Sequence, residues 1–266
     1  MFMKPIYRWI AAHPRLSKFV ITAFITVLFF FLLDPNVFPF LLRFLIIFLS
    51  LVNGFLFVNT MPERLMKEPL EMLEQQCDPY PFLAEMERQL PLCREDLQGQ
   101  MTRINYAMAL SQTGQYENAL QILEAIDIDR FPGTSPVVRY VYCNNLCDLL
   151  TRLNRFPEAD GWYRRAQQIY DQIPGSRLKQ RMEYNVTMND IEALYREGDY
   201  TSALRQLSRL SCKTQRALMS AALLAARCNL KQEEYEKARE KLQYIITNGN
   251  KLFAVEEAKQ LLSTLP

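Results

Sequence analysis

Cys143 and Cys147 stand four residues apart in the stretch CNNLC, and their type and spacing suit chemistry better than any other pair in this sequence. On a helix they share a face and supply half of a tetrahedral zinc site. Such a site needs a second closely spaced pair of cysteine or histidine ligands, and the sequence contains none. We therefore interpret both thiols as free, buried packing residues.

The sequence offers no arrangement for nucleophilic or acid–base catalysis. Its only histidine, His13, lies in a basic N-terminal stretch, and its eight glycines are scattered without forming a phosphate-binding loop. Neighbouring carboxylates such as Glu192 and Glu197 suit a solvated helix face better than an acid–base pair. We expect no catalytic residue, no cofactor and no metal, and predict that the protein is not an enzyme.

Charge is distributed unevenly along the 266 residues. The first 60 residues contain five Lys or Arg and one acid, whereas the remaining 206 contain 26 basic and 28 acidic residues. A nearly neutral main part without a basic cluster argues against a nucleic-acid partner. Six cysteines in a helical pattern of this size do not resemble a disulfide framework, which favours a reducing compartment.

Two uncharged apolar runs, residues 19–33 and 44–58, lie in the N-terminal part. Each would form about 22 Å of helix, and extension to Leu16 and Met61 approaches the roughly 30 Å of a bilayer core. We predict a transmembrane helical hairpin over residues 1–60, with spans at about 16–33 and 42–60 that contact the lipid bilayer. The alternatives are a single or re-entrant span, a buried hairpin in a globular core and a secretory signal.

Basic residues flank this predicted hairpin on the same side. Lys4, Arg8, Arg15 and Lys18 precede the first run, Arg64 and Lys67 follow the second, and only Arg43 lies between the runs. This asymmetry predicts a two-span, multi-pass membrane protein with both termini and the following domain in the cytoplasm.

Four copies of one short pattern follow the apolar part. GQYENAL at 114–120, NRFPEAD at 154–160, GDYTSAL at 198–204 and EEYEKAR at 233–239 each place an alanine three residues after an aromatic. The alanines are separated by 40, 44 and 35 residues. Such a period indicates stacked helical hairpins, with Gly114, Asn154, Gly198 and Glu233 at the turns. Glycine or asparagine at this place fits a helix end with positive φ.

These copies resemble the tetratricopeptide repeat family in their glycine–aromatic turns and second-helix alanines, and in the small residues of the first helices, such as Ala107 and Ala226. The early tryptophan of the family is absent from every copy. The resemblance implies four repeats over residues 96–248. With the apolar hairpin, the chain is similar to bacterial membrane-anchored repeat proteins of unassigned function.

We therefore predict an all-α fold. After the hairpin, residues 61–95 form a linker helical hairpin, residues 96–248 form an α-solenoid of four repeats, and residues 249–266 form a capping helix that covers the last repeat.

The resemblance also implies that a ligand binds to the concave face, which the first helices line. Residue-by-residue transfer places these residues there: Met101, Ile104, Met108, Asn144, Asp148, Arg152, Asn185, Met188, Glu192, Tyr195, Arg196 and Arg227. The methionines suit an adaptable apolar grip, although packing against a neighbouring helix explains them equally well.

Two functions remain open at this point. The first is a membrane-tethered cytoplasmic scaffold or adaptor that binds a protein or peptide on its concave face. The alternative is an accessory subunit of a membrane enzyme or transporter that contacts its partner through the hairpin.

Overall fold

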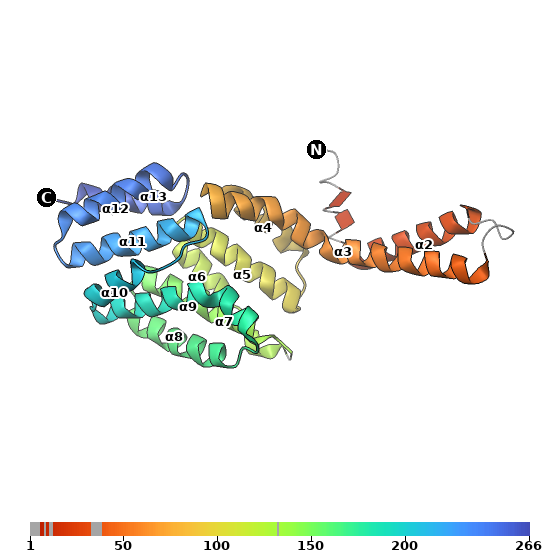
Figure 1. The fold of residues 1–266 in the computed structure, drawn as a ribbon, viewed down its shortest axis with the longest axis horizontal. Coiled ribbons are helices and arrows are strands. Elements are labelled where there is room, and N and C mark those ends of the chain that lie inside the picture. The colour runs from red at the N-terminus through yellow and green to blue at the C-terminus, as the bar shows by residue number, and fades with distance from the viewer. Residues whose placement is uncertain (1–5, 8, 11–12, 33–38, 132) are drawn as a thin grey trace. The chain divides into compact units, whose positions relative to one another are not determined.

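The computed structural model describes residues 6–7, 9–10, 13–32, 39–131 and 133–266. Within these residues the chain is helical and contains no strand (Figure 1). The α-helices are α2 (Pro14–Leu32), α3 (Phe40–Gln76), α4 (Tyr80–Gln89), α5 (Leu97–Gln112), α6 (Tyr116–Glu124), α7 (Pro136–Arg152), α8 (Phe156–Asp171), α9 (Ser176–Glu197), α10 (Tyr200–Leu207), α11 (Gln215–Lys231), α12 (Tyr235–Asn248) and α13 (Phe253–Ser263), and the 3₁₀-helices are η1 (Leu90–Leu92) and η2 (Ile128–Arg130).

The chain divides into two compact units, Met1–Pro69 and Leu70–Pro266. In the first unit α2 packs against the first part of α3 at Gly54, where a Cβ would lie 2.7 Å from Cγ2 of Ile21. The two helices leave apolar side chains on their outer faces, and Phe19 and Phe24 are 70% and 65% exposed. Residues 33–38, which include the predicted turn at Asp34, lie outside the described residues.

The prediction of a two-span membrane protein with both termini and the repeats in the cytoplasm is wrong. In the part of the chain that the structure describes, no helix combines the length and the apolar character needed to cross a bilayer. The physical reason lies at the helix ends. The uncharged runs are too short by themselves, and lengthening them brings in Arg15 and Lys18 at the start of α2 and Arg43 in α3. Without a membrane span, the predicted bilayer contact of residues 16–60 is not supported. The accessory-subunit alternative, which depends on that contact, is not supported either.

Helix α3 continues past the predicted end of the hairpin at residue 60 and reaches Gln76. It is followed by α4, which packs against α5, and the linker helical hairpin over residues 61–95 stays a prediction. The boundary between the two compact units falls inside α3, after Pro69.

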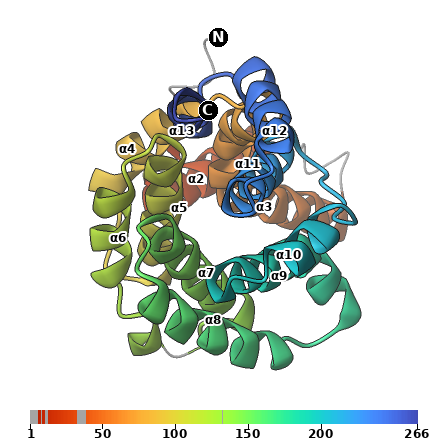
Figure 2. The ribbon, with the colours of Figure 1, turned by 90° about the vertical axis from the view of Figure 1, so that its left-hand side faces the viewer.

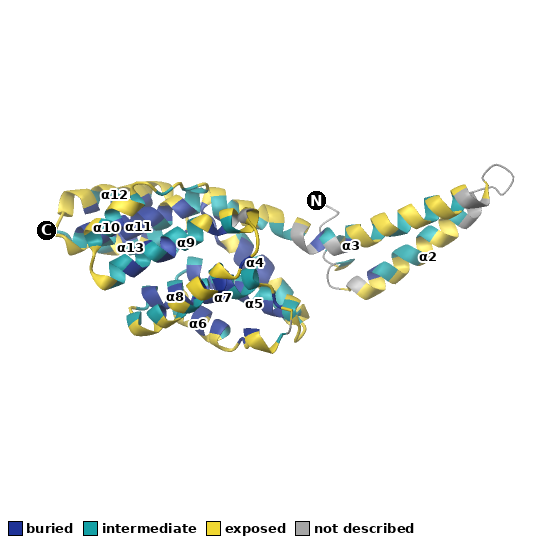
Figure 3. Cartoon of the chain, turned by 60° about the horizontal axis from the view of Figure 1, so that its bottom comes forward, coloured by how far each residue is buried: buried dark blue, intermediate teal, exposed yellow. Residues whose placement is uncertain are grey.

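The second unit consists mainly of four helical hairpins, α5/α6, α7/α8, α9/α10 and α11/α12. Each second helix begins at the aromatic residue of the repeated pattern: Tyr116, Phe156, Tyr200 and Tyr235. The four repeated alanines, Ala119, Ala159, Ala203 and Ala238, have no exposed surface. Their methyl groups are therefore fully packed inside the repeats, and Figure 3 shows that buried positions recur along the helices of this unit.

All four hairpin turns contain a residue with positive φ, as the sequence predicts. The values are 82° at Gly114, 60° at Asn154, 86° at Gly198 and 59° at Glu233. Glu233 adopts the same left-handed backbone although its side chain disfavours it, because the helices on either side require the same turn.

The hairpins are arranged in a ring in which the first helices α5, α7, α9 and α11 face inward and the second helices face outward (Figure 2). The C-terminal helix α13 packs against α11 and α12. Its first residue, Phe253, also reaches the turn of the first repeat, where its ring meets that of Tyr116 edge to face at 5.7 Å. The chain therefore returns to its own first repeat.

Candidate functional site

A cavity of about 180 Å³ lies at the inner side of the ring. All of its walls come from the four first helices, because the side chains opposite the hairpin contacts point inward. The lining residues are Asn105, Ala107, Met108, Ser111 and Gln112 from α5; Val141, Asn144, Asn145, Asp148, Leu149 and Arg152 from α7; Tyr184, Asn185, Met188, Asn189 and Glu192 from α9; and Arg216 and Ser220 from α11.

Asparagine side chains dominate the polar part of this lining. The amide nitrogen Nδ2 of Asn189 donates to Oδ1 of Asn144 at 2.9 Å, which links α9 to α7. The side chains of Asn105, Asn145 and Asn185 form no hydrogen bond to any described residue of the chain. Each amide therefore offers both a donor and an acceptor to the cavity.

Two cavity residues hold buried polar atoms without a partner among the described residues. They are the hydroxyl oxygen of Ser111 and the carboxylate oxygen Oε2 of Glu192. Buried polar atoms in folded proteins are nearly always hydrogen-bonded, because an unpaired one costs about 1–3 kcal/mol. The cavity thus contains hydrogen-bonding groups that the described protein does not satisfy.

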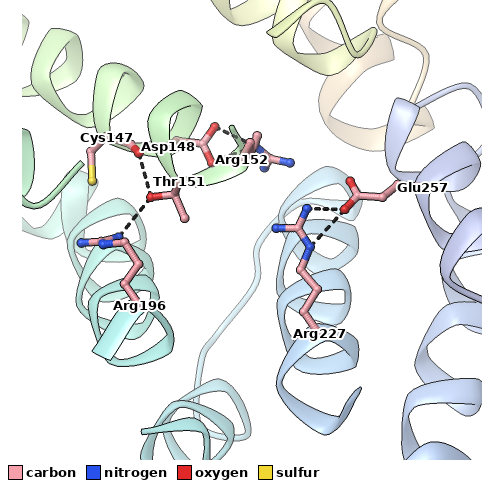
Figure 4. A network of polar contacts seen from close by, with 7 residues as sticks. All are labelled: Cys147, Asp148, Thr151, Arg152, Arg196, Arg227 and Glu257. Atoms are coloured by element: carbon pink, nitrogen blue, oxygen red, sulfur yellow. Dashed lines mark hydrogen bonds and ion pairs between the residues drawn. The ribbon is translucent and has the colours of Figure 1, made fainter. Parts of the chain in front are cut away.

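A set of opposite charges crosses the same region (Figure 4). Nε of Arg152 donates to both carboxylate oxygens of Asp148, at 2.9 and 3.0 Å, and the Arg152 guanidinium lies 5.7 Å from the ring centre of Tyr116. Burial raises the pKa of Glu192 to about 7, because the loss of hydration and the charge of Asp148 outweigh three nearby arginines. The carboxyl group is thus only partly ionised at neutral pH.

The arrangement of paired hairpins around an inward-facing surface agrees with one known family. The model of the family described as the SusR N-terminal TPR domain matches residues 90–248. This segment is more than half of the chain. The chain belongs to the tetratricopeptide repeat (TPR) family. No curated protein and no solved structure matches it. TPR repeats form a non-enzymatic protein-interaction fold, and TPR domains typically bind protein partners, which indicates an interaction scaffold.

Part of the groove predicted from the sequence gathers in the cavity of this TPR domain. The residues that line it are Met108, Asn144, Asp148, Arg152, Asn185, Met188 and Glu192. Met101 and Tyr195 do not line it, and Tyr195 packs between the rings of Phe156 and Tyr200. Ile104 is 1% exposed and belongs to the core.

Arg196 and Arg227 also point elsewhere. The Arg196 side chain is 1% exposed, and its Nε donates to Asp160 at 2.7 Å. Its Nη1 donates to the hydroxyl of Thr151 at 3.1 Å (Figure 4). That hydroxyl in turn donates to the carbonyl oxygen of Cys147 at 2.8 Å. Arg227 binds Glu257 of α13. Both arginines therefore connect helices of the TPR domain.

Cys143 and Cys147 are free and have no exposed surface, as the sequence predicts. Burial raises their pKa values to about 11 and about 12. Both thiols are therefore protonated at neutral pH.

Sequence reasoning misses several lining residues, among them Asn105, Asn145, Asn189 and Tyr184. Transfer from the family pattern places Ile104 in the groove, one residue before Asn105. Ile104 lies four residues before Met108 and Asn105 lies three residues before it, and residues three or four apart share a face. Helical spacing alone therefore does not decide which of the two faces the cavity.

Proposed function

We propose that the TPR domain is a scaffold that binds an extended polar segment of a protein partner in the cavity lined by α5, α7, α9 and α11. The observation that carries this proposal is the unsatisfied hydrogen-bonding capacity of the lining: the free amides of Asn105, Asn145 and Asn185 and the buried polar atoms of Ser111 and Glu192. An extended peptide presents alternating N–H and C=O groups, which are the partners that such amides require.

Apolar contact complements these polar groups. Met108 and Met188 line the cavity from α5 and α9. Methionine side chains are flexible and polarizable, so they adapt to side chains of different shape. The same cavity can thus hold the backbone of a partner through amides and its side chains through methionine.

Site-specific photo-crosslinking in living cells tests the proposal. A photoreactive residue replaces Asn145 or Asn185 in the full chain, and matched positions on the outer helices, Gln121 of α6 and Gln168 of α8, serve as controls. Both control residues are exposed. We expect the cavity positions to attach the same partner protein and the outer positions not to attach it.

Mapping the crosslinked peptide then decides the binding mode. An extended polar segment supports the proposal. Attachment of the same protein from Gln121 and Gln168 with equal yield places binding outside the cavity and contradicts it, as does the absence of any product from both cavity positions.

A further inference from the structure

The segment from Gly249 to Glu257 joins the last repeat to the first part of the same compact unit. The side-chain amide of Asn250 donates to the carbonyl oxygen of Gln76 at 2.8 Å. The backbone N–H of Lys251 donates to the carbonyl oxygen of Cys77 at 3.2 Å. The ammonium of Lys251 binds Asp78 at 2.6 Å. Residues about 170 positions apart in the chain thus form one contact.

The same segment reaches the first repeat and the last first helix. Phe253 packs against Tyr116, and a Cβ at Gly114 would lie 2.5 and 2.6 Å from Cγ and Cε2 of its ring. Glu257 binds Arg227 of α11 through Nε at 3.0 Å. The segment therefore closes the ring of repeats between α11 and the turn from α5 to α6.

One side chain connects this closure to the cavity. Tyr116 contacts both Phe253 and the guanidinium of Arg152, and Arg152 lines the cavity. A displacement of Phe253 thus acts on the cavity wall through a single aromatic ring.

We propose that residues 249–257 act as a latch: they hold α11 to the turn from α5 to α6 and so keep the ring of repeats closed, and their release widens the cavity. Polar contacts at Asn250, Lys251 and Glu257 join the segment to other helices, while Leu252 and Val255 are buried. Segments of a folded domain can open locally at a lower free energy than global unfolding. The latch is testable without a partner.

Thiol reagents of two sizes measure access to the cavity. Asn145→Cys in the full chain places a thiol in the cavity lining, and iodoacetamide serves as the small probe while a maleimide on a long polyethylene glycol chain serves as the bulky one. In the closed ring we expect the small probe to react much faster than the bulky probe. Mass spectrometry of peptides reads each cysteine separately.

Lys251→Ala removes the ion pair of the latch, and Lys259→Ala is the matched control. Lys259 also lies in the C-terminal segment, and its ion pair with Glu256 stays within α13 and does not join this helix to another one. We expect Lys251→Ala to raise the rate of the bulky probe at the introduced thiol about tenfold, as expected for about 1.4 kcal/mol of lost closure. Lys259→Ala should leave this rate unchanged.

The natural cysteines report whether the fold stays intact. Cys77 lies in the turn that the latch contacts and has no exposed surface, so its labelling should rise with that of the introduced thiol. Cys143 and Cys147 should stay protected because they are packed inside the second repeat. A third variant, Asn250→Ala, should act in the same direction as Lys251→Ala.

Two results overturn the latch. The first is an equal rate of reaction of the bulky probe with the thiol of Asn145→Cys, whether or not the chain also carries Lys251→Ala. The second is labelling of Cys143 and Cys147 together with Cys77, which means that the segment opens only when the repeats unfold. If crosslinking from Asn145 finds no partner while Lys251→Ala still changes access, the proposed function fails and the latch stands.

Discussion

Glu192 lies within reach of charges from three first helices: Asp148 and Arg152 on α7, Arg196 on its own helix α9, and Arg227 on α11. The arginines favour the ionised carboxylate, but loss of hydration and the charge of Asp148 disfavour it more, which raises its pKa from 4.5 to about 7. The folded protein therefore holds a proton on Glu192 that the unfolded chain releases at lower pH.

The first prediction concerns the pH dependence of stability. Below pH 4.5 both states hold the proton, and between 4.5 and about 7 only the folded state does, so the free energy of unfolding falls as the pH rises through this window. Glu192→Gln cannot lose a proton. We expect the free energy of unfolding of the wild type to fall by on the order of 2 kcal/mol, relative to that of this variant, between about pH 4.5 and pH 8.

Urea unfolding at several pH values measures this difference, and subtraction of the two curves removes the titration of all other groups. Parallel curves for the wild type and Glu192→Gln would show that the carboxyl is ionised in the folded state throughout the window.

The hydroxyl of Tyr142 carries the second prediction. It is buried and lies 3.1 Å from the carbonyl oxygens of both Leu123 and Ile126, where it satisfies the end of α6. Tyr142→Phe removes this donor and leaves the carbonyl of Leu123 only the backbone N–H of Ile126, so it should lower the free energy of unfolding by about 1–2 kcal/mol. Tyr170→Phe removes a hydroxyl that has no hydrogen bond to the described residues, so it should cost less than about 0.5 kcal/mol. Equal costs of the two changes would refute this role of Tyr142.

At the scale of the helical elements, the four turns share one backbone conformation but not one residue type. Gly114 and Gly198 adopt positive φ without a Cβ, Asn154 tolerates it, and Glu233 adopts it at a φ of 59°. A longer side chain in the left-handed region costs about 1–2 kcal/mol. The fourth repeat therefore contains strain that the other three avoid.

The third prediction relieves this strain. Glu233→Gly should raise the free energy of unfolding by about 0.5 kcal/mol, because the relieved backbone strain exceeds the entropy that glycine adds to the unfolded chain. Asn154→Gly is the matched control and should change stability by less, since asparagine already tolerates this conformation. Thermal melting of both variants provides the measurement, and destabilisation by Glu233→Gly would contradict the prediction.

Local patterns predict the hairpins well because the features that define them lie close together in sequence. Each copy of the pattern holds a turn residue, an aromatic and an alanine within seven positions. The aromatic predicts where the second helix begins, as at Tyr116, and the alanine predicts which methyl group is buried, as at Ala119. The same local patterns predict that Cys143 and Cys147 are buried.

Long-range and three-dimensional features lie beyond such patterns. The contact of Phe253 with Tyr116 joins residues 137 positions apart, and no periodicity relates them. The rotation of each first helix about its axis decides whether Ile104 or Asn105 faces the cavity, and one residue changes this rotation by about 100°. The membrane prediction failed for a different reason, because the predicted spans were extended past the charged residues Lys18 and Arg43.

At the scale of the whole repeat unit, the closed ring makes the first and last repeats stabilise each other. Gly114 is the point where this can be measured, since it has a φ of 82° and also lies against Phe253. Gly198 has a similar φ of 86°, but a Cβ at this position would have no neighbouring atom within 4 Å. The two glycines thus share a backbone requirement and differ in the ring contact.

The fourth prediction compares alanine at these two positions. Gly198→Ala should cost about 1 kcal/mol from its backbone conformation alone. Gly114→Ala should cost about 1–3 kcal/mol more, because its methyl group must displace the Phe253 ring. Guanidinium unfolding of both variants measures the difference. Equal costs would show that Phe253 yields freely and that the closure contributes little to stability.

The contact between the C-terminal segment and the first repeat limits the number of repeats that the ring can contain. In an open solenoid a duplicated hairpin lengthens the stack and leaves the other interfaces intact. Here an added hairpin would carry Asn250 and Phe253 one repeat away from Gln76 and Gly114, and a deleted hairpin would leave them unable to reach. Internal duplication, in evolution or in design, therefore changes this fold only if both ends of the ring are rebuilt at the same time.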